Sequence, residues 1–154
     1  MAFIPVNINT KLGRILVIGG GKVALHKLKT ITRFSRNVTV IAPKILPEIG
    51  RLGVKVIRRP YCKILLKRAF LVYACTDDNA VNRQVRRDAR EVGILANVAD
   101  DKKLCDFISP AVYKRGHMVV SVCSQGKDVK AAVALRDNIQ RYLEDDKRLR
   151  RRSS

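Results

Sequence analysis

The chain has 154 residues, 47% of them apolar, which suits one ordinary domain with a buried core and excludes a disordered tail. No apolar run approaches the roughly 20 residues of a membrane span, and the first ten residues lack the pattern of a secretion signal, so neither an anchor nor a leader is expected. The 32 lysines and arginines exceed the 13 acids to give a net charge of +19, which predicts attraction to polyanions.

The net charge bears on the class of partner, and the cysteines bear on the cellular compartment. The polyanion could be a nucleic acid, an anionic membrane surface or a small molecule with many carboxylates. The alternative explanation of the excess of basic residues is a general surface charge without a specific partner. Aromatic residues are only 5% of the chain and form no platform on which bases could stack, so the net charge is the only feature that favours a nucleic acid. No membrane partner is expected. The cysteines are scattered without a C-x-x-C pair, which predicts a reducing cytoplasm and no zinc site; they are Cys62, Cys75, Cys105 and Cys123.

Residues 14–27 predict a buried strand, a glycine turn and the start of a helix. Gly19, Gly20, Gly21 and Ala24 give the pattern G-x-G-x-x-A. The first glycine permits a tight turn, Gly21 permits close approach of a pyrophosphate, and Ala24 lets the helix pack close to the strand. The positive end of the helix favours the same phosphate. The stretch therefore predicts a dinucleotide-binding turn, with a plain tight turn as the alternative.

Strand-like and helix-like segments alternate along the first two thirds of the chain. Strands are expected at residues 15–18, 38–42, 54–57, 70–76 and 94–99. Helices are expected at about 22–34, at 46–53, and from Asp77, Asp78 or Asn79 to Gly93. The apolar stripe of the third helix is Val81, Val85, Ala89 and Val92. This alternation predicts an α/β fold with a Rossmann-like, doubly wound parallel sheet.

The pattern changes after residue 110. One strand is expected over residues 118–124, and Asp128 opens a last helix. The apolar stripe of that helix is Val129, Ala132, Val133, Arg136, Ile139 and Leu143. Such a strand-plus-helix subdomain cannot bury both its faces alone, so it is expected to dock on the main sheet or on a second copy, which would make a homodimer. The expected parts are a nucleotide-binding domain at 1–112, a dimerisation subdomain at 113–146 and a basic tail at 147–154.

Several motifs then occur in one order and spacing. They are V-I-G-G-G-K-V-A-L-H-K at 17–27, A-C-T-D-D at 74–78 with Val81-Asn82, N-V-A-D at 97–100, F-I-S-P-A at 107–111 and S-Q-G-K at 124–127. The ordered set resembles the precorrin-2 dehydrogenase family, the amino-terminal domain of siroheme synthase, over roughly residues 3–145. That family oxidises precorrin-2 to sirohydrochlorin with NAD in siroheme biosynthesis, and some members also insert ferrous iron. The resemblance implies this oxidoreductase activity, NAD as cofactor and a polycarboxylate tetrapyrrole as substrate; iron insertion stays open.

The resemblance also implies the residues of the site. Asp100 matches the family's essential aspartate and would take a proton from the macrocycle, although Asp101 is adjacent and a turn-forming pair is the alternative. Lys44 stands near where many NAD sites carry an acid on the ribose, so NADP stays open. The implied cofactor residues are Gly19, Gly21, Lys22, Val23, Pro43, Lys44, Thr76 and Asn97. The implied substrate residues are Ser124, Gly126 and Lys127, acting through N–H groups and charge, and no metal ligand is expected.

Two other classes of protein compete with the enzyme. Nucleotide-sensing regulatory domains of potassium transporters share the glycine fingerprint and a segment like residues 76–82. They usually carry the ribose-binding acid that is missing here, and the motifs at 107–111 and 124–127 are not expected in them. A nucleic-acid binder rests on charge alone and predicts affinity that falls steeply with salt. The enzyme is the favoured class.

Overall fold

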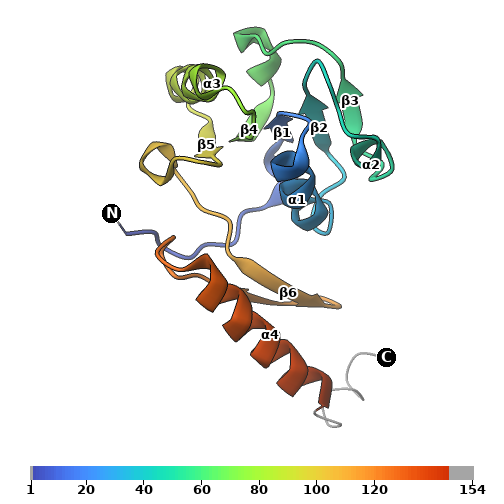
Figure 1. Ribbon diagram of the computed structural model, residues 1–154, viewed down its shortest axis with the longest axis vertical. Helices are drawn as coiled ribbons and strands as arrows, with labels where there is room; N and C mark the ends of the chain where they lie inside the picture. Colours follow the sequence, from blue (N-terminus) through green and yellow to red (C-terminus); the bar gives the residue numbers. More distant parts are fainter. Residues whose placement is uncertain (1, 146–154) are drawn as a thin grey trace. The chain divides into compact units, whose positions relative to one another are not determined.

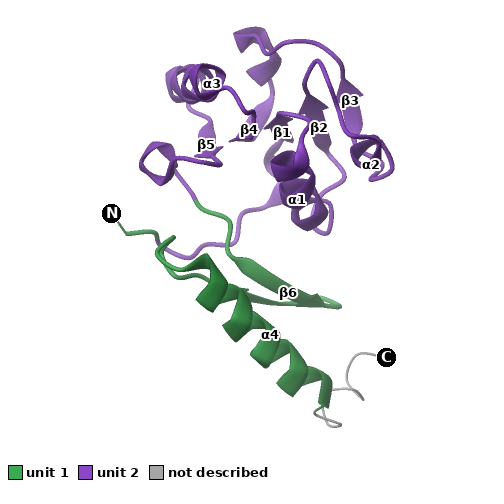
Figure 2. Cartoon of the chain, viewed as in Figure 1, with its two compact units in different colours: residues 1–3, 108–154 green, residues 4–107 purple. Residues whose placement is uncertain are grey.

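The computed structural model describes residues 2–145. The chain divides into two compact units, residues 4–107 and residues 1–3 with 108–154 (Figure 2). The expected basic tail at 147–154, like residue 146, lies outside the described residues. The domain boundaries expected from the sequence stay a prediction, because a compact unit is a group of contacts and not by itself an independently folding domain.

The unit of residues 4–107 is built on five parallel strands in the order β3-β2-β1-β4-β5 (Figure 1). The strands are β1 (Arg14–Ile18), β2 (Val38–Ile41), β3 (Lys55–Ile57), β4 (Ala69–Ala74) and β5 (Leu95–Val98). The helices are α1 (Lys22–Ile31), α2 (Pro47–Gly50) and α3 (Asn79–Glu91), with 3-10 turns η1 (Thr10–Leu12), η2 (Lys63–Leu66) and η3 (Lys102–Leu104). This arrangement confirms the predicted Rossmann-like sheet.

Both faces of the sheet are covered, which explains why its central strands are nearly continuous apolar runs. One face packs on α1; its buried cluster includes Ile15, Val17, Val40, Leu71 and Tyr73 of the sheet and Ala24, Leu28 and Ile31 of the helix. Residues that alternate with these, such as Leu16 and Val72, point to the other face and are fully buried. There α3 contacts β4 and β5, so the sheet lies between α1 and α3 (Figure 1).

The predicted apolar stripe of α3 is wrong at its C-terminal end. Val92 lies beyond the helix and is 50% exposed, while Asp88 and Asn82 are buried instead. The Asp88 carboxylate accepts hydrogen bonds from Tyr61 Oη at 2.9 Å and Gln84 Nε2 at 2.7 Å. Buried polar groups are tolerated when they are hydrogen-bonded in this way. The buried face of α3 therefore includes polar side chains as well as the predicted apolar ones.

The second unit contains a hairpin and one long helix. Strand β6 (Ala111–Arg115) pairs antiparallel with β7 (Met118–Val122), and α4 (Val129–Asp145) contacts both strands. Ala132 is buried on the inner face of α4, and Arg136 Nη1 donates to the Val112 carbonyl at 3.0 Å. The sequence predicted a single strand here, so β6 is an element that sequence reasoning missed. None of the helices within residues 2–145 is long and apolar enough to cross a membrane.

The thiol of Cys75, which follows β4 and is 5% exposed, gives the fold a pH dependence. Burial raises its pKa from the usual 9.0 to about 12. The folded chain thus holds this proton more tightly than the unfolded chain does, so the contribution to stability is complete below about pH 8 and is lost as the pH rises through the range from 9 toward 12.

We expect Cys75→Ala to lose unfolding free energy less steeply than the wild type from about pH 9 to about pH 11. The difference in slope should approach, at most, about 1.4 kcal/mol per pH unit, the value for one proton. Urea unfolding at a series of pH values measures it. Cys123→Ala, which removes an exposed thiol, is the control and should keep the wild-type slope. Equal slopes in Cys75→Ala and the wild type would contradict the account.

Candidate functional site

The carboxyl ends of the strands bring most of the predicted site residues to one edge of the sheet. Gly19 to Gly21 follow β1, Pro43 and Lys44 follow β2, Thr76 follows β4 and Asp100 follows β5. The strand order reverses between β1 and β4, because the chain runs outward to β3 and then returns to the other side of β1. Ligands of open α/β sheets bind in the crevice at such a reversal, outside the carboxyl ends of the strands.

Two of the three glycines hold the loops of this edge against one another. Gly19 has a φ of +124°, and a Cβ atom there would collide with the Cys75 carbonyl and come within 3.0 Å of the Thr76 nitrogen. A Cβ on Gly20 would collide with the Lys44 carbonyl and the Ile45 backbone. Sequence reasoning gave Gly20 no role, although its place inside the glycine run was the available signal. Glycine is thus required where the loop after β1 meets the loops after β4 and β2.

The third glycine faces open space instead of protein. Apart from its neighbours along the chain, no atom of residues 2–145 lies within 4 Å of a Cβ built on Gly21. Gly21 is the N-cap of α1, no side chain caps the helix, and its first turn carries no acid. The first-turn N–H groups, which have no partner within a helix, are left for a ligand together with the exposed Lys22 and Val23. These features fit a pyrophosphate, which binds N–H groups and the positive end of a helix.

Thr76 is held in place by Asn82, a residue to which the sequence analysis gave no role of its own. The Thr76 N–H donates to Asn82 Oδ1 at 3.1 Å, and Asn82 Nδ2 donates to the Thr76 carbonyl at 3.0 Å. The Thr76 hydroxyl accepts from the Asp78 N–H at 3.2 Å. Asp78 Oδ1 also accepts from Ala80 N at 2.7 Å, which makes it the N-cap of α3 among the three predicted candidates. The edge after β4 is therefore fixed by side-chain to backbone bonds.

The two adjacent acids after β5 have different surroundings. Asp101 Oδ1 accepts from the Lys103 N–H at 2.9 Å and so caps η3. The side chain of Asp100 is exposed, and within residues 2–145 its carboxylate has no hydrogen bond or ion pair. Both acids line a small pocket of about 160 Å³ together with side chains of α3, Asn82 and Arg83 among them. Asp100 is thus the acid that is available to a ligand.

Asn97 is buried in β5, one residue before the strand ends. Its Nδ2 donates to the Phe107 carbonyl at 2.9 Å, and its Oδ1 is buried without a partner among the described residues. The Phe107 ring packs edge-on against Tyr73, with ring centroids 5.2 Å apart. Asn97 therefore anchors the segment that leaves the sheet, and its place in cofactor binding stays a prediction.

The predicted substrate residues lie in the other unit, in the turn between β7 and α4. Gln125 and Gly126 have positive φ values of 57° and 66°, and the Lys127 N–H donates to the Ser124 carbonyl at 3.0 Å. The Ser124 hydroxyl accepts from the Asp128 N–H at 3.0 Å. The N–H groups of residues 125, 127 and 128 are thus already engaged, with Gln125 N–H donating to the Cys123 sulfur at 3.3 Å. The exposed Lys127 side chain and the hydroxyl hydrogen of Ser124 remain for a ligand.

The sheet, the glycine loop and the uncapped α1 terminus together define a dinucleotide-binding protein of the Rossmann-like class. A family model described as "Putative NAD(P)-binding" matches residues 6–111. The solved structure of SirC, a precorrin-2 dehydrogenase, superposes with a TM-score of 0.79 at 22% identity, over 91% of this chain and 70% of that one. This likeness confirms the fold.

Curated relatives narrow the class to a family. The precorrin-2 dehydrogenase of Bacillus subtilis is 30% identical over 147 residues, which cover 93% of this chain and 90% of that protein. Siroheme synthase 1 of Cronobacter sakazakii is 35% identical over 147 residues, and siroheme synthase of Nitrosococcus oceani is 33% identical over 149, each match covering 93% of this chain. The chain spans only 31% of the length of these two synthases. The chain belongs to the precorrin-2 dehydrogenase and siroheme synthase family.

Alanine at Gly20 and at Gly21 separates packing from ligand binding. Gly20→Ala should lose about 1–3 kcal/mol of unfolding free energy, because the new methyl group meets backbone that cannot move cheaply. Gly21→Ala should keep wild-type stability and lose NAD⁺ affinity by about tenfold or more, because its methyl group enters space left for the pyrophosphate. Thermal unfolding and calorimetric titration measure the two effects. Unchanged NAD⁺ affinity in Gly21→Ala would contradict the assignment.

Proposed function

We propose that the chain is an NAD-dependent precorrin-2 dehydrogenase, which oxidises precorrin-2 to sirohydrochlorin in siroheme biosynthesis. Membership of the family supports the proposal, since a relative of that name is matched over 90% of its length. The observation that carries it is the position of Asp100: its carboxylate is exposed and unpaired among the described residues, at the sheet edge where the glycine loop lies.

The residues of this edge divide the work between holding a cofactor and moving a proton. Gly21 and the first turn of α1 would hold the pyrophosphate, with the charge of Lys22 beside it. NAD⁺, when bound, accepts the hydride that leaves the substrate. The oxidation also releases a proton from the macrocycle, and the Asp100 carboxylate oxygen would accept it. Asp101 is the weaker candidate for this role, because its carboxylate already caps η3.

The substrate of this proposal matches the charge of the chain. A net charge of +19 attracts a polycarboxylate over distances of the order of the Debye length, about 8 Å at physiological salt. We assign binding of substrate carboxylates to the Ser124 hydroxyl and the Lys127 ammonium, and to the Gly126 N–H in the same turn. The other N–H groups of the turn are engaged within the protein.

The proposed assembly is a homodimer formed through the unit of residues 108–145. Several large apolar side chains of this unit are exposed, among them Met118, Val129, Leu135 and Tyr142. Contiguous exposed apolar surface is typical of interfaces, and the proposed homodimer requires these side chains to form one such surface. The proposed place of action is a reducing cytoplasm, because all four cysteines are free thiols.

The direct test is an anaerobic assay with precorrin-2 and NAD⁺ that follows NADH formation and the sirohydrochlorin spectrum. Asp100→Asn should lower kcat by about 10²–10⁴-fold, the usual effect of removing a general base. Asp101→Asn is the matched control and should keep most of the activity, because an amide oxygen can still cap η3. Turnover in Asp100→Asn would move the base elsewhere. A wild-type chain that binds NAD⁺ without turnover would favour the nucleotide-sensor class.

The loop after β2 is where NAD and NADP would be distinguished, because it lies where the adenosine ribose is expected. No acid follows β2 directly, and the exposed Lys44 is the charged residue there. Lys44→Glu should leave NAD⁺ affinity within about threefold and lower NADP⁺ affinity by about tenfold or more, because a carboxylate repels a 2′-phosphate. Calorimetric titration with both dinucleotides measures the two affinities. An unchanged NADP⁺ affinity would remove Lys44 from the ribose site.

A further inference from the structure

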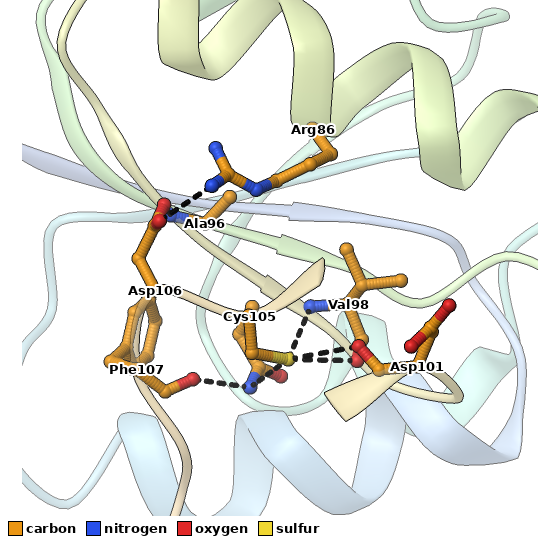
Figure 3. Close-up of polar contacts among 8 residues, drawn as sticks. Arg86, Ala96, Val98, Asp101, Cys105, Asp106 and Phe107 are labelled. Carbon is orange, nitrogen blue, oxygen red and sulfur yellow. Dashed lines mark hydrogen bonds and ion pairs between the residues drawn. The ribbon is translucent and has the colours of Figure 1, made fainter. Parts of the chain in front are cut away.

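The outer edge of β5 is closed by side chains in place of a sixth strand (Figure 3). Alternate residues of a strand bond to opposite neighbours, so Ala96 and Val98 turn their backbone groups away from β4. The Ala96 N–H donates to Asp106 Oδ2 at 3.0 Å, and the Asp106 N–H donates to the Ala96 carbonyl at 2.8 Å. The Val98 N–H donates to the Cys105 sulfur at 3.2 Å. An edge strand normally leaves such groups unpaired, so residues 101–106 replace the missing neighbour.

The Cys105 thiol joins the two ends of the loop that carries Asp100. Its sulfur accepts from the Val98 N–H and lies 3.2 Å from the Val98 carbonyl oxygen and 3.4 Å from the Asp101 carbonyl oxygen. The single S–H hydrogen is donated toward these two oxygens. Val98 precedes the loop and Asp101 ends it, so Asp100 lies on a short span whose backbone is tied to one sulfur atom at both sides.

The thiol can do this because it keeps its proton. Cys105 is 8% exposed, and burial is the main reason that its pKa is raised above the usual value. The carboxylates of Asp101 and Asp106 act in the same direction, while the backbone bond from Val98 and the charge of Lys27 act against it. A thiolate would accept from the Val98 N–H but could donate to neither carbonyl, so only the thiol joins both ends of the loop.

Asp106 ties the same loop to a helix. Its Oδ1 accepts from Arg86 Nη2 of α3 at 2.6 Å, while its Oδ2 accepts from the Ala96 N–H. One carboxylate thereby joins α3, β5 and the loop. The ion pair is largely buried, since the Arg86 side chain is 19% exposed and the Asp106 side chain 26%. The loop therefore has two independent attachments, the thiol of Cys105 and this bridge.

We propose that Cys105 is a positioning residue for the reaction, acting through the backbone on either side of Asp100 to hold its carboxylate where the substrate proton is released. This inference rests on the proposed function, because it assigns Asp100 the role of base. The network also includes Asn97, whose Nδ2 donates to the Cys105 sulfur at 3.4 Å as well as to the Phe107 carbonyl. It includes no residue of the glycine loop or of the first turn of α1, so the inference predicts a change in the proton-transfer step with little change in pyrophosphate binding by NAD⁺.

The test compares Cys105→Ala and Cys105→Ser with the wild type in the same anaerobic assay. Cys105→Ala should lower kcat by about ten- to a hundredfold, the scale of a misplacement of about 1 Å, and should move the acid limb of the kcat–pH profile. The KM for NAD⁺ should stay within about twofold. Cys105→Ser should recover most of kcat, because a hydroxyl can also accept from Val98 and donate to a carbonyl. Cys62→Ala, which removes a half-buried thiol directly before η2, is the matched control and should behave as the wild type.

Two further measurements separate a misplaced Asp100 from an unfolded chain. Thermal unfolding shows whether each variant is folded, and amide hydrogen exchange at Val98 should be faster in Cys105→Ala and restored in Cys105→Ser. If Cys105→Ala does not fold, Asp106→Asn takes its place: it removes the Arg86 ion pair, keeps an acceptor for Ala96, and should show a smaller kcat loss with the same shift of the pH profile.

The outcomes separate this inference from the function on which it rests. Wild-type kcat and pH profile in a folded Cys105→Ala chain would overturn the positioning role alone. A loss of kcat that Cys105→Ser does not recover would also overturn it, because packing and not hydrogen bonding would then be the cause. Full turnover in Asp100→Asn would overturn the assignment of the base and the inference with it.

Discussion

The close approach of backbone to backbone at Gly19 and Gly20 is the constraint on which the rest of the site depends. At both positions a single added carbon atom would meet main-chain atoms of a neighbouring loop. Because those atoms belong to the loops after β4 and β2, the two glycines set the spacing between three strand ends at once. Gly21 is then free to face open space, and α1 begins there without a capping side chain. Packing and ligand binding are thus divided among consecutive residues.

In the loop after β5, local hydrogen bonds give two adjacent aspartates different functions. Asp100 and Asp101 are identical side chains, yet the start of η3 engages only the second. The loop that contains them is short and closes on the exposed edge of β5, where a thiol and a carboxylate complete the hydrogen bonding. A carboxylate kept free on a loop fixed at both ends suits a general base, which needs a defined distance to the proton it accepts.

The sequence predicted the sheet well because long apolar runs and glycines report burial and close approach directly. It missed β6, because Lys114 and Arg115 near the end of the strand obscure the alternation of apolar and polar residues. It also extended the apolar stripe of α3 to Val92, because only apolar residues were expected on the buried face, where Asn82 and Asp88 in fact lie. Their partners, Thr76 and Tyr61, come from other elements, which periodicity does not register. For the same reason the sequence could not separate Asp100 from Asp101 or assign a role to Cys105.

The central claim is that the carboxyl edge of the sheet binds the dinucleotide, and a titration of the isotope-labelled chain with NAD⁺, followed by amide NMR shifts, tests it most directly. The account predicts the largest shifts at Gly21, Lys22 and Val23, smaller ones near Lys44, Thr76 and Asp100, and none at the opposite edge, where Arg68 and Ile94 line a separate pocket. Shifts concentrated at that opposite edge, or no shifts at the α1 terminus at saturating NAD⁺, would contradict the account.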